Sequence, residues 1–266
     1  MTADPASGAP GAPQFLVRPD GSVAGDDGAS GALAAALPYT GRLARRMGEL
    51  AGVGDLRLVE AFGTDHLTVG VTWTPAGEGT YRAALAPLAP RTVPTFTVVG
   101  AVDPAAAVIH CLGRLDAVEG VSWSAVVTVD ARVIGIQAEQ QDLDRLAEVG
   151  NRMLAILRSL EDQHGSGFVR LGFEEGALLG ASLGRHALVA AIDGADDEAL
   201  TAMIDEVRAI LADQDLSAVA SHREPEVAPV VEAPPEVPPV APAPLVGARF
   251  GGAAPRKERG SRRFGR

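Results

Sequence analysis

The sequence predicts an α+β fold in which an antiparallel five-stranded sheet packs with three helices, in the order αββαβββα, over residues 102–215. Three observations predict this fold. Three stretches place apolar residues at helical spacing behind typical capping residues. Five β-rich runs accompany them, and short turns join neighbouring runs, which favours antiparallel pairing. About 110 residues are enough to bury a core of this size.

The domain is expected to begin with a helix and a hairpin. Asp103 is a typical N-cap residue, and Pro104 suits the first turn because an amide hydrogen there has no helical acceptor. Apolar residues at helical spacing then share one face of the helix, and Gly120 ends it. The two strands that follow are residues 121–129 and 132–138, joined by a tight turn at Asp130-Ala131.

A long helix follows, capped by Asp142 and running to about Gln163. Its apolar residues cover more than one face, which a helix lying on a single sheet does not need. The sequence therefore predicts a second apolar surface packed against this helix. The apolar positions are Leu143, Leu146, Ala147, Val149, Met153, Leu154, Ile156, Leu157 and Leu160.

Three short strands and a helix complete the domain. Turns at 174–176 and 183–185 separate the strands, and Asp196 or Asp197 caps the final helix, which ends near Ala212. The strands are residues 168–173, 177–182 and 186–192.

The rest of the chain divides into three segments. Residues 1–36 are expected to be flexible, because they hold too few apolar side chains to offset the entropy of ordering, although residues 15–24 have the pattern of a small edge hairpin. Residues 37–101 form a small α+β segment. Residues 216–266 are expected to be a disordered linker with eight prolines between 221 and 245, followed by a basic tip.

The segment 37–101 contains a partial sequence repeat of the main domain, displaced by 65 residues. Residues 47–53 match 112–118, Asp65 matches Asp130, and Gly70 matches Gly135. Two interpretations stay open: a truncated or degenerate copy of the main domain, or an unrelated α+β extension packed on it.

Composition and charge exclude several classes of protein. The net charge of −11 argues against a nucleic-acid-binding body, and residues 246–266 carry +6, so the other 245 residues carry −17. One cysteine, Cys111, excludes a disulfide framework and any cluster of metal-binding cysteines. The absence of a long apolar run and of a signal-peptide pattern predicts a cytoplasmic protein.

A search for catalytic motifs predicts no catalytic, cofactor or metal site. Residues 180–184 match G-x-S-x-G, but a nucleophilic serine in that motif needs a helix after the turn, and a strand is expected here. A Ser182 hydrolase is therefore a remote alternative. His110 beside Cys111 is interpreted as a surface histidine next to a core cysteine. The chain has no phosphate-binding loop of the P-loop type, so it is not itself expected to be a GTPase.

Residues 104–212 resemble the roadblock/LC7 (MglB-like) family, whose fold is akin to longin and profilin-like domains. The resemblance depends on Leu112 to Val121, followed by the hairpin through Asp130, and on residues 172–179 and 184–190. Ala131-Arg132 departs from the family at a turn where a glycine is usual. The resemblance implies a binding platform that pairs through its long helix and the neighbouring strand edge, and that engages Ras-like small GTPases of the MglA kind.

On this basis we expect a non-enzymatic platform that binds and regulates a small GTPase, as a homodimer or as a pseudo-dimer within one chain. The alternative is an oligomeric adaptor with no GTPase partner, whose basic tip engages an acidic surface. The long helix and strand 168–173 are expected to carry the contact, with Arg152 and Arg158 at its polar rim. The candidate interaction residues are Val149, Arg152, Met153, Ile156, Arg158, Leu160, Phe168 and Arg170.

Overall fold

The computed structural model describes residues 14–25, 31–88, 103–137, 142–164, 167–194 and 196–221. The chain separates into two compact units, Met1–Arg223 and Glu224–Arg266, and all the described residues belong to the first. Of the predicted linker and basic tip, residues 222–266 lie outside the described residues, whereas 216–221 are described and bury Leu216 and Val219.

The described unit is built on one sheet of ten strands in which every neighbouring pair is antiparallel. The strands are β1 (Gln14–Val17), β2 (Val23–Gly25), β3 (Leu56–Phe62), β4 (Asp65–Trp73), β5 (Gly79–Pro87), β6 (Val121–Val127), β7 (Val133–Gln137), β8 (Phe168–Phe173), β9 (Ala177–Leu183) and β10 (His186–Ile192). Their order across the sheet is β2-β1-β5-β4-β3-β8-β9-β10-β6-β7.

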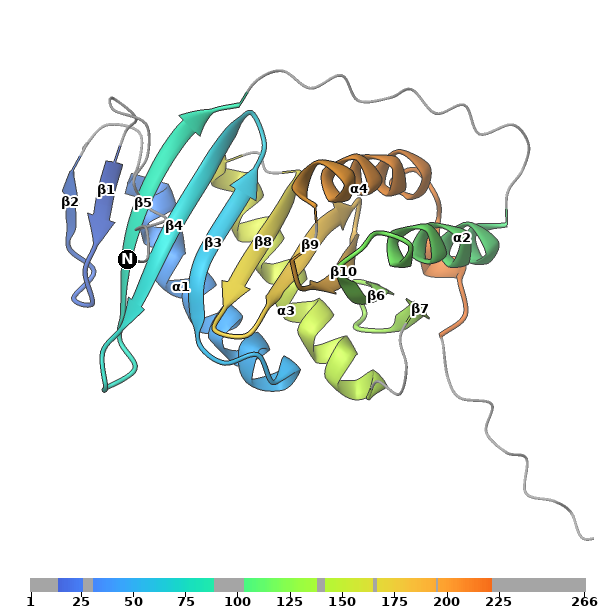
Figure 1. Ribbon diagram of the computed structural model, residues 1–266, viewed down its shortest axis with the longest axis horizontal. Helices are drawn as coiled ribbons and strands as arrows, with labels where there is room; N and C mark the ends of the chain where they lie inside the picture. Colours follow the sequence, from blue (N-terminus) through green and yellow to red (C-terminus); the bar gives the residue numbers. More distant parts are fainter. Residues whose placement is uncertain are drawn as a thin grey trace, which may run out of the picture. The chain divides into compact units, whose positions relative to one another are not determined.

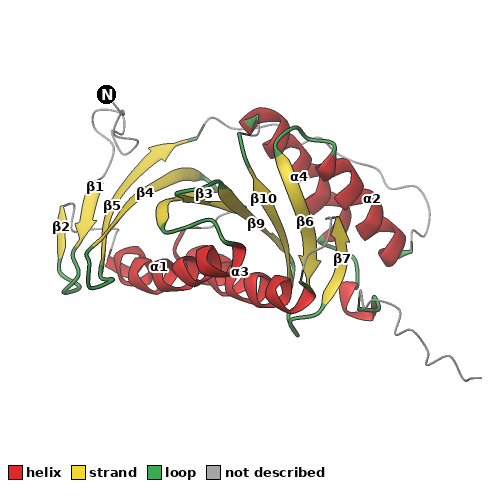
Figure 2. Ribbon diagram, turned by 60° about the horizontal axis from the view of Figure 1, so that its bottom comes forward, coloured by secondary structure: helices red, strands yellow, loops and turns green. Residues whose placement is uncertain are grey.

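Four helices cover the sheet unequally. They are α1 (Gly31–Ala51), α2 (Pro104–Asp116), α3 (Leu143–His164) and α4 (Asp197–Leu211), followed by a 3-10 turn at Leu216–Ala218. Figure 2 shows α1 and α3 together on one face and α2 with α4 on the other. Among the described elements, no helix lies on the face of β3, β4 and β5 that Figure 1 turns to the viewer.

The second half of the unit confirms the predicted α+β class and the order αββαβββα, with α2, β6, β7, α3, β8, β9, β10 and α4 in sequence. The predicted caps are present, since the Asp103 carboxylate accepts a hydrogen bond from the amide of Ala106, and the Asp196 carboxylate accepts one from Glu198. Ala131 has φ +56°, the left-handed conformation that explains why a glycine is usual at this turn.

The first half repeats the second. β1-β2-α1-β3-β4-β5 follows the same path as β6-β7-α3-β8-β9-β10, with the strands in mirrored order, and the halves meet where β3 pairs with β8. The repeat begins at β1, so residues 14–25 form the edge hairpin whose pattern the sequence has at 15–24. The helix α1 begins at Gly31, within the segment 1–36 that was expected to be flexible. α1 takes the place of α3, whereas the offset of 65 matched it to α2. Counterparts of α2 and α4 are absent from the described part of this half.

Both central helices approach the sheet at a glycine. A β-carbon added to Gly150 of α3 would overlap the side chain of Val127 on β6, and one added to Gly41 of α1 would overlap the ring of Tyr81 on β5. The two halves therefore use the same device, a glycine that lets a helix lie close to a strand.

Replacing Gly150 with alanine is expected to lower the free energy of unfolding by about 1 kcal/mol. Overpacking against Val127, which is β-branched and stiff, costs about 1–3 kcal/mol, and the better helix propensity of alanine recovers about 1 kcal/mol of it. The matched control is Gly113→Ala on α2, where a β-carbon meets nothing within 4 Å. That variant is expected to be more stable than the wild type in urea unfolding, and equal effects of the two substitutions would contradict the close approach.

Candidate protein-binding surface

The two halves of the unit are joined by a sheet pairing and a helix packing. β3 and β8 pair with Glu60 opposite Arg170 and with Ala61 opposite Val169. On one face of this seam, α1 and α3 share a single apolar core that also contains strand residues of both halves. The broad apolar stripe predicted on the long helix is therefore covered from within the chain.

Five of the eight candidate interaction residues are buried. Val149, Met153, Ile156 and Leu160 are buried in the core that α1 and α3 share, and Phe168 is buried on the opposite face of the sheet, where its ring stacks on Phe62 with centroids 4.4 Å apart. These side chains hold the two halves together, and their burial leaves the three arginines of the set as the members that solvent reaches.

Arg170 lies at the centre of the seam, on the face opposite α3. Its guanidinium is 3.7 Å from the Glu60 carboxylate on β3 and also pairs with Asp197 at the start of α4. The same Glu60 carboxylate lies 3.2 Å from Nε2 of His66. Arg170 thus links β8, β3 and α4, and it is separated by the sheet from Arg152 and Arg158 on α3.

The outer sides of α1 and α3, which face away from the sheet, are polar. Arg152 is 2.7 Å from the Glu148 carboxylate, and Arg46 of α1 reaches the same carboxylate at 3.9 Å. Arg42 and Arg158 are exposed and form no ion pair with any residue that the structure describes. The predicted rim residues therefore belong to a surface that both helices supply.

Sequence reasoning missed the contribution of α1 to this surface. The exposed ring of Tyr39 and the guanidinium groups of Arg42 and Arg46 come from a helix that had been matched to α2, which lies on the other face of the sheet. The available signal was the run of Tyr39, Arg42 and Arg46 at helical spacing, opposite apolar residues at the intervening positions.

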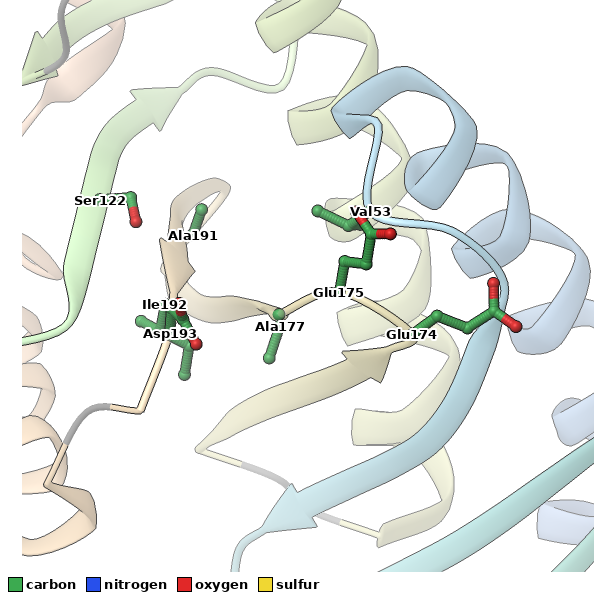
Figure 3. A pocket seen from close by; sticks show the side chains of 9 residues that line it. Val53, Ser122, Glu174, Glu175, Ala177, Ala191, Ile192 and Asp193 are labelled. Atoms are coloured by element: carbon green, nitrogen blue, oxygen red, sulfur yellow. The ribbon is translucent and has the colours of Figure 1, made fainter.

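A cleft of about 460 Å³ lies where the turn between β8 and β9 meets the loop after α1 (Figure 3). The Glu175 amide donates to the Val53 carbonyl at 3.0 Å, so the backbones of the two halves touch at this point. Glu174 accepts a hydrogen bond from the Asp55 amide at 3.3 Å and pairs with Arg57, and the Arg57 guanidinium lowers the pKa of that carboxyl. Glu174 therefore links the two halves through a hydrogen bond and an ion pair.

A second cleft of about 330 Å³ adjoins the first and extends toward Glu60, Arg170 and Asp197. The two clefts share the lining residues Gly176, Ala177, Ile192 and Asp193. Three of the five carboxylates that line the clefts, those of Glu60, Glu174 and Asp197, pair with arginines. In the parts of the chain that the structure describes, no group of three metal-binding side chains is present.

The structure places the remaining chemical candidates as the sequence indicated. Ser182 stands at the end of β9, its hydroxyl 3.4 Å from the Gly184 carbonyl, and the strand β10 follows the turn. His110 is exposed on α2, while Cys111 is buried, and burial raises the pKa of its thiol to about 11.

His186 is buried at the start of β10 between two partners. Its Nδ1 accepts a hydrogen bond from the Val129 amide at 3.3 Å, which requires a neutral ring, and Nε2 lies 3.4 Å from the Ser217 hydroxyl. Burial lowers the pKa of His186, and Arg185 and Arg132 lower it further, against the opposing effect of Asp130 and Asp215.

The stability that His186 provides is expected to fall as the pH drops below about 6.5, the pKa of an unfolded histidine. The unfolded chain takes up the proton first because the folded pKa is lower, so acid favours unfolding by at most about 1.4 kcal/mol per pH unit. Urea unfolding of the wild type and His186→Gln at pH 7.5 and 5.5 measures this. The difference in free energy of unfolding between the two proteins should be smaller at pH 5.5 than at pH 7.5. An equal difference at both pH values would contradict the neutral ring.

No helix in the described part of the chain has the length and apolar character that crossing a membrane requires.

Comparison with known proteins gives likenesses among solved structures alone. No protein-family model matches the chain, and no curated protein matches it. Among solved structures, a roadblock/LC7 domain from Streptomyces avermitilis is similar over 38% of this chain and 86% of that domain, with 18% sequence identity and a TM-score of 0.31. This domain has the same family name as the resemblance carried by residues 104–212. The α+β fold itself is established by the element order and strand pairing of the chain.

Proposed function

We propose that this chain is a non-enzymatic binding platform for a Ras-like small GTPase, and that one chain forms the platform alone. The observation that carries the proposal is the internal seam, where β3 pairs with β8 and α1 packs on α3. In the family that residues 104–212 resemble, two subunits pair through the long helix and the neighbouring strand edge. Here a single chain supplies both partners of that pairing.

The burial of the candidate residues supports this interpretation. Val149, Ile156 and Leu160 are shielded by α1 and by the sheet, so they have no apolar surface left to recruit a second copy. A partner protein is then expected to dock on the polar outer sides of α1 and α3, where Arg152 and Arg158 lie. Arg170 acts on the other face as a structural link between the halves.

Two measurements test the proposal. Sedimentation of the full chain at high micromolar concentration is expected to give the mass of one chain, 27.3 kDa. The immobilised chain is expected to retain members of a panel of Ras-like GTPases loaded with GDP or with a non-hydrolysable GTP analogue. Retention of no member in either nucleotide state would overturn the GTPase assignment, and a stable dimer would overturn the single-chain platform.

A further inference from the structure

The segment that follows α4, residues 215–221, is held against the rest of the unit by side chains (Figure 1). We call it the post-α4 segment. Within the described chain its backbone–backbone hydrogen bonds are all local, since the amides of Leu216, Ala218 and Val219 donate to carbonyls two or three residues earlier. It pairs with no described strand. The segment can therefore move away without breaking a hydrogen bond of the sheet or of a long helix.

Four side chains make the attachment. Leu216 and Val219 are buried in the apolar core that α2 and α4 cover. Arg132, which follows the turn between β6 and β7, donates from its guanidinium to the Ser217 carbonyl at 3.0 Å and to the Val219 carbonyl at 3.4 Å. His186, at the start of β10, holds the Ser217 hydroxyl at 3.4 Å from Nε2.

The protonation state of His186 decides whether its two contacts can exist together. Nδ1 accepts a hydrogen bond from the Val129 amide at 3.3 Å, so in the neutral ring the hydrogen is on Nε2 and is donated to Ser217. A proton added at Nδ1 would point at the Val129 N–H, which is also a donor. That hydrogen bond is then lost, and the ring has to turn away from Val129 and with it from Ser217.

Four charged side chains face this ring. Arg185, in the turn between β9 and β10, and Arg132 both oppose a positive charge on it. Asp130, in the turn between β6 and β7, and Asp215 of the post-α4 segment favour one. Burial is the largest effect and acts in the same direction as the arginines, so the pKa of His186 is lower than that of an ordinary histidine. The charged ring is therefore more stable in water than between its present partners.

We propose that protonation of His186 releases the post-α4 segment while the sheet and the four helices stay folded. At neutral pH the uncharged ring joins the segment to the turn between β6 and β7, and in mild acid this joint opens. Opening exposes Leu216 and Val219, together with the part of the apolar core that they cover. The device requires no partner protein, so it is independent of the proposed function.

Hydrogen exchange of single amides in the full chain, followed by NMR at pH 7.5 and 5.5, tests the proposal. A protection factor compares each measured rate with that of an unstructured chain at the same pH, so the direct effect of pH cancels. The protection factors of the Val129 and Val219 amides are expected to fall by up to about tenfold at pH 5.5. The open state has a histidine pKa of about 6.5 and takes up a proton that the closed state binds more weakly.

Low concentrations of urea separate local opening from unfolding of the whole unit. The Val219 protection factor should hardly change with urea, because releasing a short segment exposes little surface. The amide of Leu179, on a strand paired on both sides, should be better protected and should lose protection as urea is added. Equal protection of the two amides at every urea concentration would overturn the proposal.

Two variants test whether His186 is the group that titrates. His186→Gln keeps an acceptor for the Val129 amide but cannot be protonated, so its protection factors should not differ between the two pH values. His110→Gln, at an exposed position on α2, is the matched control and should behave as the wild type. Arg185→Gln, also exposed, removes a cation that faces the ring, so the closed state binds the proton better and the fall should be smaller.

A fall in protection at pH 5.5 that persists in His186→Gln would overturn the proposal, because another group would then cause the opening. If His186→Gln does not fold, Arg185→Gln decides, and a fall equal to that of the wild type contradicts the role of the ring. A fall that is absent in the first variant and reduced in the second supports it.

Discussion

Replacing Ile156 with aspartate is expected to lower the free energy of unfolding by more than about 4 kcal/mol, a large share of the 5–15 kcal/mol of a typical domain. Ile156 is fully buried in the core that α1 and α3 share. A carboxylate there has no cation within the apolar cluster, and burying it uncompensated costs several kcal/mol. Urea unfolding measures the loss, with Asn151→Asp, an exposed position on the same helix, expected to change stability by about 0.5 kcal/mol or less.

The same substitution tests whether the two halves fold as one unit. The chain has two tryptophans, Trp73 on β4 in the first half and Trp123 on β6 in the second, and both pack against the shared core. Fluorescence of Trp73→Phe and Trp123→Phe backgrounds therefore reports one half at a time. Ile156→Asp is expected to shift both unfolding midpoints equally. A shift confined to the Trp123 signal would mean that the first half is stable without α3.

The second half of the fold was readable from the sequence because its signals are local. Asp103 caps α2 at the predicted residue, and the turn at Asp130-Ala131 joins two strands as expected. The broad stripe on α3 also indicated that another surface covers this helix. What the sequence did not identify was the cover itself, because α1 packs there through the small and apolar residues Ala44 and Met47, which carry no distinctive motif.

The first half was harder to predict because topology, and not residue identity, relates it to the second. Matching Gly70 to Gly135 at an offset of 65 aligned β4 with β7, whereas β4 occupies the place of β9. The pattern of residues 15–24 indicated the edge hairpin of β1 and β2, but nothing in these two short strands indicated that β1 pairs with β5.

The apolar and the charged members of the candidate interaction site differed in how much the sequence could say about them. The apolar members were selected because α3 has a broad stripe, and a stripe alone does not say whether a second chain or the same chain covers it. The arginines were better guides, since a charged side chain stays near solvent whichever partner covers the apolar face. Arg152 and Arg158 accordingly lie on the outer side of α3, at a surface to which Arg42 of α1 also belongs.

Arg170→Met is expected to lower the free energy of unfolding by about 2 kcal/mol, because it leaves the Glu60 carboxylate at the seam without its cation. Glu60 and Arg170 are only 15% and 20% exposed, so water compensates the charge incompletely. Glu60→Gln alone leaves Arg170 paired with Asp197 and should cost less. In the double variant the largely buried position 60 carries no charge, and the Asp197 carboxylate that loses Arg170 is 75% exposed to water, so the loss should be smaller than the sum of the single losses by about 1 kcal/mol.

The double-mutant cycle distinguishes a charge pair from simple packing of the Arg170 stem. If the stem alone mattered, the effects of Arg170→Met and Glu60→Gln would add, because methionine keeps most of the apolar length of arginine. Urea unfolding at low and high salt completes the measurement, since the pair lies on the sheet face that no described helix covers over β3. Additive losses at both salt concentrations would show that the seam is held by the β3–β8 pairing and the α1–α3 core, without help from this ion pair.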